Sequence, residues 1–355
     1  MGPTTQVPKE PRFHLPAMAE DTREGIVSTI GNTPLVKLTR LFRSYGFNLY
    51  AKMEAFNPAG SIKDRTALSI IKNALDRGLI KPGDTIIESS SGNMGIGMAQ
   101  ICAYYGLRFI CVVDPKVTCL NIEILKAFGA TVDLVSAPDP QTGEFLQARI
   151  NRVKDLLQSI DDSFWPDQYC NPANPEAHHR TMREIVEALN GDIDFLFCAA
   201  STCGTIRGCA EFIKAHKLRT KIYAVDAVGS VIFGGQSATR LIPGHGAAVR
   251  PQLYQPDLAD ESLYITDIQC VIGCRWLAQQ EAILAGGSSG AVIMAVDAVR
   301  RSIPEGANCV IILPDRGERY LDTIFSNEWV ERHFGNIPPL PTDYGEAKQL
   351  ALSSA

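Results

Sequence analysis

One lysine stands where its amine could act as a base or a nucleophile. Lys63 lies in the segment Asn57-Pro58-Ala59-Gly60-Ser61-Ile62-Lys63-Asp64-Arg65, which joins an apolar run ending at Met53 to a helix-like segment that begins near Lys63. The positive end of a helix dipole disfavours an ammonium ion in the first turn, so the pKa of Lys63 should be lowered. Such an amine can form a Schiff base and serve as a general base. A solvated lysine in a turn is the alternative interpretation.

A second segment has the residue types of an anion site. It reads Ser89-Ser90-Ser91-Gly92-Asn93-Met94-Gly95-Ile96-Gly97 and lies between an apolar run and a helix-like segment. Hydroxyls, an amide and backbone N–H groups at a helix N-terminus suit a carboxylate. The candidate binding residues are Ser90, Ser91, Gly92, Asn93 and Met94. A capped helix start with turn glycines is the alternative.

A third segment combines small and hydroxylated residues. Ser201, Thr202, Cys203, Gly204 and Thr205 come directly after an apolar run and before a helix-like segment. Backbone N–H groups here could hold a phosphate, with the hydroxyls as further donors. The segment lacks the lysine of a nucleotide-binding P-loop, which argues against ATP or GTP.

The elements that must position these three segments alternate between strand-like and helix-like, at a spacing typical of βα units and a mostly parallel sheet. The expected strands are residues 49–53, 85–88, 109–113, 131–135, 195–198, 222–225 and 310–313. Helical periodicity predicts a helix over residues 65–77, and residues 161–175 are expected to form a loop that crosses between lobes. The fold class is therefore α/β. Each candidate segment follows a strand, at the edge where open α/β sheets bind ligands.

Charge and composition narrow the class of partner. A formal net charge of −5 over 355 residues gives no basic field for nucleic acid, and no apolar run approaches the length of a membrane-spanning helix. The expected partners are therefore small molecules. The ten cysteines form no CxxC pair and no zinc-type spacing with histidine, which predicts reduced thiols, no metal site and a cytoplasmic location.

Taken together, these segments resemble a known family along most of the chain. Six ordered blocks carry the resemblance: Ile30-Gly31-Asn32-Thr33-Pro34-Leu35-Val36, the Asn57–Arg65 segment, Ser90-Ser91-Gly92-Asn93, Asn171-Pro172-Ala173-Asn174-Pro175, Ile283-Leu284-Ala285-Gly286-Gly287-Ser288-Ser289-Gly290 and Gly317-Glu318-Arg319-Tyr320-Leu321. They are similar to the cysteine synthase and cystathionine β-synthase family, the fold-type II enzymes that use pyridoxal 5'-phosphate (PLP).

The resemblance implies a two-lobed, tryptophan synthase β-like fold with parallel sheets, PLP in the cleft between the lobes, and a homodimer. Residues 25–55 plus 167–334 would form a large PLP-binding lobe, and residues 56–166 a small mobile lobe. Proline-containing residues 1–24 are expected to be a flexible tail without a secretory signal, and residues 335–355 a C-terminal tail.

The resemblance also assigns roles to individual residues. Lys63 would carry PLP, Asn93 would bond the ring hydroxyl, Ser201 to Thr205 would hold the phosphate, and Ser288 would face the pyridine nitrogen. The substrate α-carboxylate would be bound by Ser90, Ser91 and Asn93. These residues belong to one block with Gly92 and Met94. A neutral serine at the pyridine nitrogen makes the ring a weaker electron sink than an aspartate would, which favours β-elimination over transamination.

The implied reaction is a β-replacement on O-acetyl-L-serine or O-phospho-L-serine. Lys63 would remove the α-proton, the leaving group would depart to give an aminoacrylate, and a nucleophile would add to the β-carbon. Lys63 would then return the proton.

The nucleophile is suggested by departures from plain cysteine synthases. This chain has Met94 where they usually have threonine, a less glycine-rich third segment, and Pro243-Gly244-His245-Gly246-Ala247-Ala248-Val249-Arg250-Pro251 in place of their glycine-rich stretch. An amino-acid nucleophile needs cationic partners for its carboxylates, and Arg250, Arg316, Arg207 and His245 are candidates. The pattern resembles the branch that makes N-(2-amino-2-carboxyethyl)-amino acids, which includes siderophore-precursor and aspergillomarasmine synthases.

We therefore expect C–N bond formation with the amine of aspartate or glutamate. A cysteine synthase that uses sulfide is the alternative, in which case the arginines are surface or interface residues. A non-catalytic PLP-binding regulatory protein is disfavoured because Lys63 and Asn93 are both present. A serine or threonine dehydratase shares the lysine but usually has a different block around it.

Overall fold

The computed structural model describes residues 23–336 and 339–341. Most residues of the tails predicted at 1–24 and 335–355 lie outside this range. Within it, no helix has the length and apolar character needed to cross a membrane.

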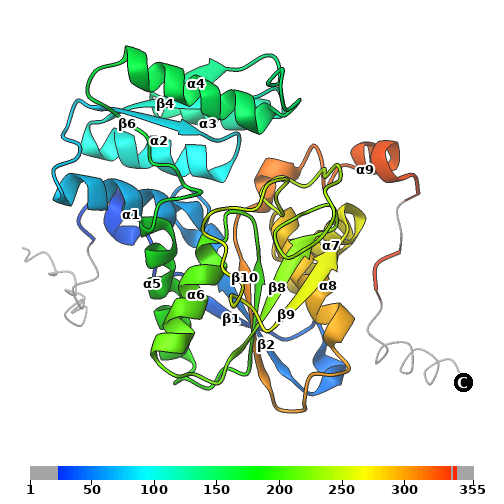
Figure 1. The fold of residues 1–355 in the computed structure, drawn as a ribbon. Coiled ribbons are helices and arrows are strands. Elements are labelled where there is room, and N and C mark those ends of the chain that lie inside the picture. Colours follow the sequence, from blue (N-terminus) through cyan, green and yellow to red (C-terminus); the bar gives the residue numbers. More distant parts are fainter. Residues whose placement is uncertain (1–22, 337–338, 342–355) are drawn as a thin grey trace, which may run out of the picture.

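The larger of two sheets has six strands in the order β1-β2-β10-β7-β8-β9 (Figure 1). Only the edge pair β1–β2 is antiparallel, and the other neighbours are parallel. The strands are β1 Leu35–Leu38, β2 Asn48–Met53, β7 Phe195–Ala199, β8 Lys221–Ala227, β9 Glu261–Ile265 and β10 Asn308–Leu313. Side chains alternate between the two faces of each strand, so both faces of the central strands carry apolar residues.

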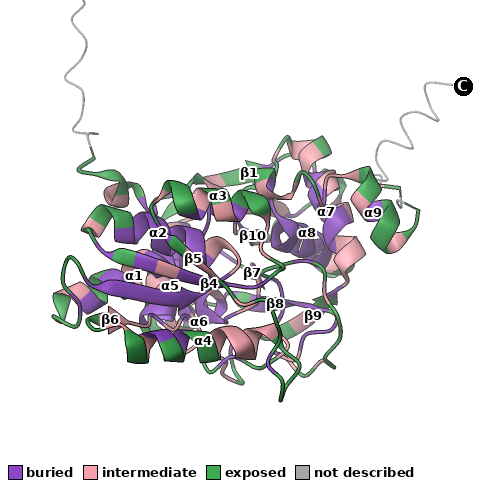
Figure 2. Cartoon of the chain, turned by 90° about the horizontal axis from the view of Figure 1, so that it is seen from above, coloured by how far each residue is buried: buried purple, intermediate pink, exposed green. Residues whose placement is uncertain are grey.

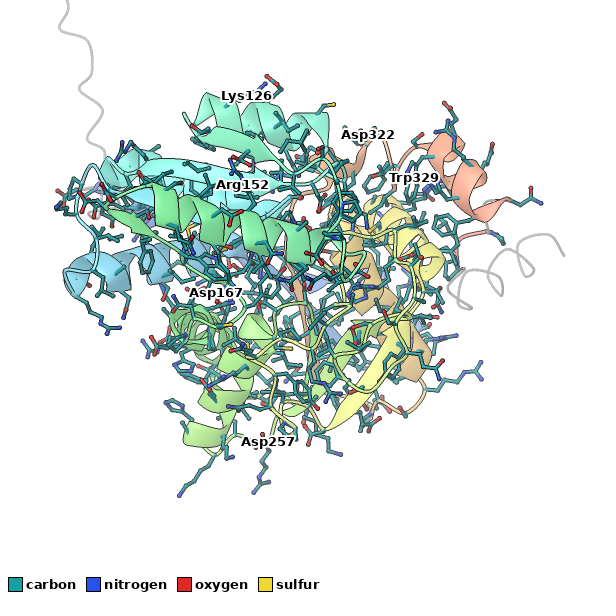
Figure 3. All side chains as sticks on the ribbon, turned by 45° about the horizontal axis from the view of Figure 1, so that its top comes forward. Lys126, Arg152, Asp167, Asp257, Asp322 and Trp329 are labelled. Atoms are coloured by element: carbon teal, nitrogen blue, oxygen red, sulfur yellow. The ribbon has the colours of Figure 1, made fainter. Side chains whose placement is uncertain are left out.

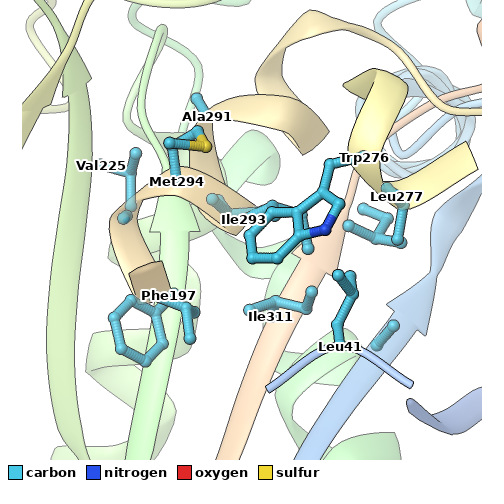
Figure 4. Packing of buried hydrophobic residues seen from close by; sticks show 14 of the residues in the cluster. Leu41, Phe197, Val225, Trp276, Leu277, Ala291, Ile293, Met294 and Ile311 are labelled. Atoms are coloured by element: carbon cyan, nitrogen blue, oxygen red, sulfur yellow. The ribbon is translucent and has the colours of Figure 1, made fainter. Parts of the chain in front are cut away.

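Helix pairs cover both faces of this sheet. On one face α7 (Asp267–Glu281) and α8 (Gly287–Val299) pack against Phe197, Val225 and Ile311 (Figure 4). On the other face α5 (Ala173–Ala188) and α6 (Gly204–Ala215) pack against Leu196, Cys198 and their neighbours. The central helix α8 is almost completely buried, whereas α9 (Asn327–Phe334) lies at the surface (Figure 2).

The smaller sheet has four parallel strands in the order β5-β4-β3-β6. They are β3 Thr85–Ser89, β4 Arg108–Val113, β5 Thr131–Leu134 and β6 Ser163–Phe164. Helices α1 (Lys63–Asp76) and α2 (Asn93–Tyr105) share one core with this sheet, and α4 (Phe145–Ser159) packs on its other face. Helix α3 (Cys119–Ala127) joins β4 to β5. Charged side chains such as Lys126 and Arg152 lie on the outside of this unit (Figure 3).

Four short 3-10 helices complete the described secondary structure: Ile26–Thr29, Arg43–Tyr45, Glu54–Phe56 and Gly317–Tyr320. All seven predicted strands are present within one or two residues of their expected ends. The expectation of a loop over residues 161–175 was wrong in part, because β6 pairs with β3 there and α5 begins at Ala173. Pro175 is tolerated because it lies in the first turn of α5, where backbone N–H groups have no partner within the helix.

Candidate active site

The three candidate segments lie at the carboxyl ends of strands, as predicted. Lys63 is the first residue of α1 and follows β2, Asn93 opens α2 after β3, and Gly204 opens α6 after β7. A fourth segment follows β10 and meets the first two at Asp315, which forms an isolated bridge with Ser61. The smaller sheet reaches the same point, since Asn93 Nδ2 donates to Asp315 Oδ2 over 2.7 Å. Segments from both sheets therefore meet around one buried carboxyl group.

The amine of Lys63 has the property expected of a catalytic lysine. Burial lowers its pKa to about 8, and the nearby thiols of Cys198 and Cys203 offset part of that effect. The side chain is only partly accessible to solvent. The expected direction of the shift is confirmed, but its main cause is burial rather than the helix dipole. At pH 7 about a tenth of Lys63 is thus free amine, far more than for a lysine of ordinary pKa, and Schiff-base chemistry and proton abstraction need that form.

Asn93 is held from two sides by the segment after β10. Its amide group donates to Asp315, and its carbonyl oxygen accepts from Arg319. Arg319 also donates to the carbonyl oxygen of Ala59, in the segment that carries Lys63. Tyr320 donates from its hydroxyl to Asp315 over 2.5 Å. This network fixes which end of the Asn93 amide faces which partner.

The hydroxyls next to Asn93 already have partners. Ser90 Oγ accepts from the backbone N–H groups of Gly92 at 3.3 Å and Gly95 at 3.1 Å, so it caps the start of α2. Ser91 Oγ accepts from Arg149 at 3.0 Å. The side chain of Met94 is 2% exposed and belongs to the hydrophobic core beside the smaller sheet. A ligand at this segment would therefore meet the backbone of Met94 rather than its side chain.

The segment of Ser201 to Thr205 forms a tight turn into α6. Cys203 adopts a left-handed conformation with φ of 65°, which a residue with a Cβ atom rarely takes and which is frequent at functional sites. Thr202 Oγ1 accepts from the N–H of Gly204 at 3.3 Å. Thr205 Oγ1 lies 3.3 Å from Nε2 of His178. These contacts within the protein hold the loop in its conformation.

Ser288 and Asp315 flank the start of α8. Ser288 is 9% exposed and lies in the first turn of that helix. A Cβ atom on Gly286 would come within 2.2 Å of Asp315 Oδ1, and that oxygen is buried without a hydrogen-bond partner among the described residues. Burial raises the pKa of Asp315 above its usual value, and the hydrogen bonds from Tyr320 and Asn93 oppose that shift.

The cationic candidates for acceptor binding lie at the edges of these segments. Arg316 is exposed and donates from Nε to the carbonyl oxygen of Ala55 over 2.8 Å. Arg250 is also exposed, and its guanidinium lies over the ring of Tyr254 with 4.8 Å to the centroid. Arg207 forms an ion pair with Glu211 at 2.7 Å. His245 is buried, and burial lowers its pKa to about 4, so it is neutral at physiological pH.

Sequence reasoning missed the residues that connect the segments. Arg319 contacts both Asn93 and Ala59, while only its neighbour Arg316 was singled out. Asn174 and His178 contact both α1 and the turn before α6, yet no role was assigned to either. Their membership of recognisable blocks, Gly317–Leu321 and Asn171–Pro175, was the available signal for Arg319 and Asn174.

The protein-family model described as pyridoxal-phosphate dependent enzyme matches residues 26–315 of the chain. The chain belongs to this family. A curated member, N-(2-amino-2-carboxyethyl)-L-glutamate synthase from Ralstonia nicotianae, is 44% identical over 310 residues, which cover 87% of this chain and 91% of that protein.

Solved structures of enzymes that act on serine derivatives by name share the fold. O-ureido-L-serine synthase superposes with a TM-score of 0.80 at 29% identity, covering 92% of this chain and 99% of that one. An O-acetylserine dependent cystathionine β-synthase from Helicobacter pylori gives a TM-score of 0.79 at 31% identity, covering 85% and 98%. The expected fold-type II architecture is thereby confirmed.

The described residues fit the family cofactor. A partly buried lysine of lowered pKa, a tight turn with hydroxyls before α6, and a serine at the start of α8 are suited to an aldehyde, a phosphate and a pyridine nitrogen. When bound, PLP supplies a ring that withdraws the electron pair left at the substrate α-carbon after proton removal.

Proposed function

We propose that this PLP-dependent enzyme is a transferase that moves a 2-amino-2-carboxyethyl group from O-acetyl-L-serine or O-phospho-L-serine to the amine of an acidic amino acid, aspartate or glutamate. The observation that carries the proposal is the 44% identity, across nearly the full length of both chains, to a protein named N-(2-amino-2-carboxyethyl)-L-glutamate synthase. The name of the Helicobacter pylori neighbour supports an O-acylated serine as donor.

The residues of the chain are proposed to divide the work as follows. Ser90, Ser91, Gly92, Asn93 and the backbone of Met94 bind the donor α-carboxylate, and Ser201 to Thr205 bind the cofactor phosphate. Ser288 faces the pyridine nitrogen, and Lys63 attaches the cofactor. Free Lys63 amine takes the α-proton of the donor, and acetate or phosphate then leaves the β-carbon. The acceptor nitrogen forms a bond to that carbon and loses a proton, and Lys63 returns a proton to the α-carbon.

Lys63 is suited to both proton transfers because its pKa of about 8 is close to the working pH. A hydrogen bond donated to Asp315 and one accepted from Arg319 orient the Asn93 amide before the donor arrives. We assign Arg250 and Arg316 to the acceptor carboxylates, because both are exposed cations next to the cofactor-binding segments.

We also propose the larger-scale organisation that the resemblance implies. Residues 25–55 with 167–334 would form the cofactor-binding lobe, and residues 56–166 a small lobe that moves. Two sheets with separate hydrophobic cores support this division. A homodimer in the cytoplasm is proposed on the family resemblance and on the free cysteines.

Acceptor competition tests the proposal. Purified holoenzyme is mixed with each donor and with glutamate, aspartate or sulfide, and release of acetate or phosphate is followed together with product mass. The proposal predicts donor turnover that depends on glutamate or aspartate, with one molecule of secondary-amine product for each leaving group. If sulfide is the only nucleophile that supports turnover and cysteine is the product, the proposal is wrong and the enzyme is a cysteine synthase. Pyruvate formed from serine would indicate a dehydratase.

A further inference from the structure

The first turns of α5 make side-chain contacts with the site that none of the proposed residue roles explains. Asn174 has no solvent exposure, and both the nitrogen and the oxygen of its side-chain amide form hydrogen bonds. Nδ2 donates to the carbonyl oxygen of Gln168 over 2.7 Å and to Thr202 Oγ1 over 3.3 Å. Oδ1 accepts from Thr66 Oγ1 over 3.3 Å. One buried amide therefore joins the turn before α6 to α1, the helix that Lys63 begins.

His178, one turn further along α5, makes the same connection. Its Nε2 lies 3.3 Å from both Thr66 Oγ1 and Thr205 Oγ1, and its Nδ1 lies 3.2 Å from Thr181 Oγ1. Burial lowers the pKa of His178 well below its usual value, so the ring is neutral and has one donor and one acceptor nitrogen. Because Thr66 Oγ1 donates its one proton to Asn174, both contacts of Thr66 are hydrogen bonds when Nε2 of His178 carries the ring proton and donates to Thr66.

Two glycines let α6 approach α5 closely enough for these contacts. A Cβ atom on Gly204 would lie 2.0 Å from Asn174 Oδ1, and one on Gly208 would lie 2.1 Å from the carbonyl oxygen of Pro175. Such separations leave no space for any side chain. The turn that precedes α6 is therefore held at a fixed position by the first turns of α5.

Asn174 is also connected to the Ser89–Gly97 segment. Gln168, whose carbonyl oxygen accepts from Asn174, donates from its backbone N–H to Glu88 over 3.3 Å and from its side chain to the carbonyl oxygen of Ser89 over 3.5 Å. Ser89 ends β3, directly before the serines proposed to bind the donor carboxylate. The buried network thus extends to all three segments.

We infer that Asn174 and His178 are positioning residues that set the place of the Ser201–Thr205 turn relative to Lys63. Thr66, their shared partner, lies three residues after Lys63 in α1. A cofactor held at both ends, by its aldehyde carbon at Lys63 and by its phosphate at the turn, binds well only if these two sites keep a fixed separation. The inference rests on the proposed assignment of the turn to the cofactor phosphate.

Two buried threonines on opposite sides of His178 provide a matched test. Thr66→Val removes the hydroxyl that connects α1 to Asn174 and His178, whereas Thr181→Val removes a hydroxyl that bonds His178 within α5 alone. Both threonines are fully buried, and both changes keep the side-chain shape. The dissociation constants of PLP and of pyridoxal, which lacks the phosphate, are measured on the full chain after removal of bound cofactor, together with the melting temperature.

We expect Thr66→Val to weaken PLP binding about tenfold, the effect of one or two lost hydrogen bonds, and to weaken pyridoxal binding much less. Thr66→Ser should restore the preference for PLP. Thr181→Val should lower the melting temperature but keep the wild-type ratio of the two constants. If Thr66→Val does not fold, His178→Asn is measured, since it keeps a polar atom near Thr181 and cannot reach Thr66 or Thr205.

Equal losses for PLP and pyridoxal, or equal changes in Thr66→Val and Thr181→Val, would overturn the inference. These outcomes are separate from the proposed reaction, because cofactor affinity is measured without donor or acceptor. A wild-type enzyme that makes no secondary amine would disprove the proposed function and leave this result unchanged.

Discussion

Glu184 on α5 is expected to stabilise the protein more than any exposed ion pair does. Its carboxylate lies 2.6 Å from Arg65 and 2.7 Å from Lys52, and the exposed fractions of the three side chains are 9%, 3% and 2%. Burial alone would raise the pKa of Glu184, but hydrogen bonds and charges from Arg65 and Lys52 lower it to about 2. Because the folded pKa lies below the unfolded value, the stabilisation is present above pH 4.5 and is lost as the pH falls toward 2.

The size of the effect follows from that shift. Each pKa unit corresponds to about 1.4 kcal/mol, so a decrease from 4.5 to about 2 predicts about 3 kcal/mol at pH 7. Breaking a buried ion pair by removing one partner typically costs about 3 to 5 kcal/mol, in agreement. Glu184→Gln leaves Lys52 buried without that charge, and it should lower the free energy of unfolding by about 3 kcal/mol.

The assay is urea unfolding at pH 7 with saturating PLP, followed by circular dichroism. Arg180→Ala is the matched control, because Arg180 pairs with the same carboxylate at 3.2 Å but has a side chain that is 47% exposed. It should cost less than about 1 kcal/mol. A loss below about 1 kcal/mol for Glu184→Gln, or an equal loss for Arg180→Ala, would refute this reasoning.

Three further predictions concern the site and its surroundings. Gly208→Ala should reduce the free energy of unfolding by about 1 to 3 kcal/mol in the same assay, because its new Cβ would meet the Pro175 carbonyl oxygen at 2.1 Å. Arg319→Ala should lower kcat/KM for the serine donor about tenfold, because it releases Asn93. Arg316→Ala should raise KM for the acceptor alone. Steady-state kinetics with each substrate varied in turn distinguishes the two effects. Burial raises the pKa of Glu88 to about 8 and of Asp64 to about 7. Between pH 5.5 and 8 the folded state therefore binds more protons at these groups than the unfolded chain does. The urea midpoint should consequently fall as the pH rises over that range. A midpoint that rises over that range in step with these groups would contradict their assignment as neutral.

The interior strands could be predicted from the sequence, whereas three of the four edge strands could not. Strands such as β8 and β10 are buried on both faces, so they appear as continuous apolar runs. The three strands that were missed, β1, β6 and β9, are all edge strands with few buried residues. Their pairing depends on neighbours that lie far away in the sequence.

The residues of the candidate site that lie in local patterns could be predicted, and its long-range contacts could not. Lys63, Asn93 and Gly204 each begin a helix after a strand, and that local pattern is visible in the sequence. Arg319 contacts Asn93 across 226 residues of sequence, and Asn174 contacts Thr66 across 108. No local pattern specifies such contacts, because they depend on how the two sheets come together.

Transfer of labelled nitrogen tests the central claim most directly. Holoenzyme is incubated with O-phospho-L-serine or O-acetyl-L-serine and ¹⁵N-labelled glutamate, and in parallel with ¹⁵N-labelled aspartate, with Lys63→Ala as the control. We predict a secondary amine that retains the label, in an amount equal to the acetate or phosphate released, and none from the Lys63→Ala protein. Release of acetate or phosphate while all the label stays in the free amino acid, or equal product from Lys63→Ala, would contradict the account.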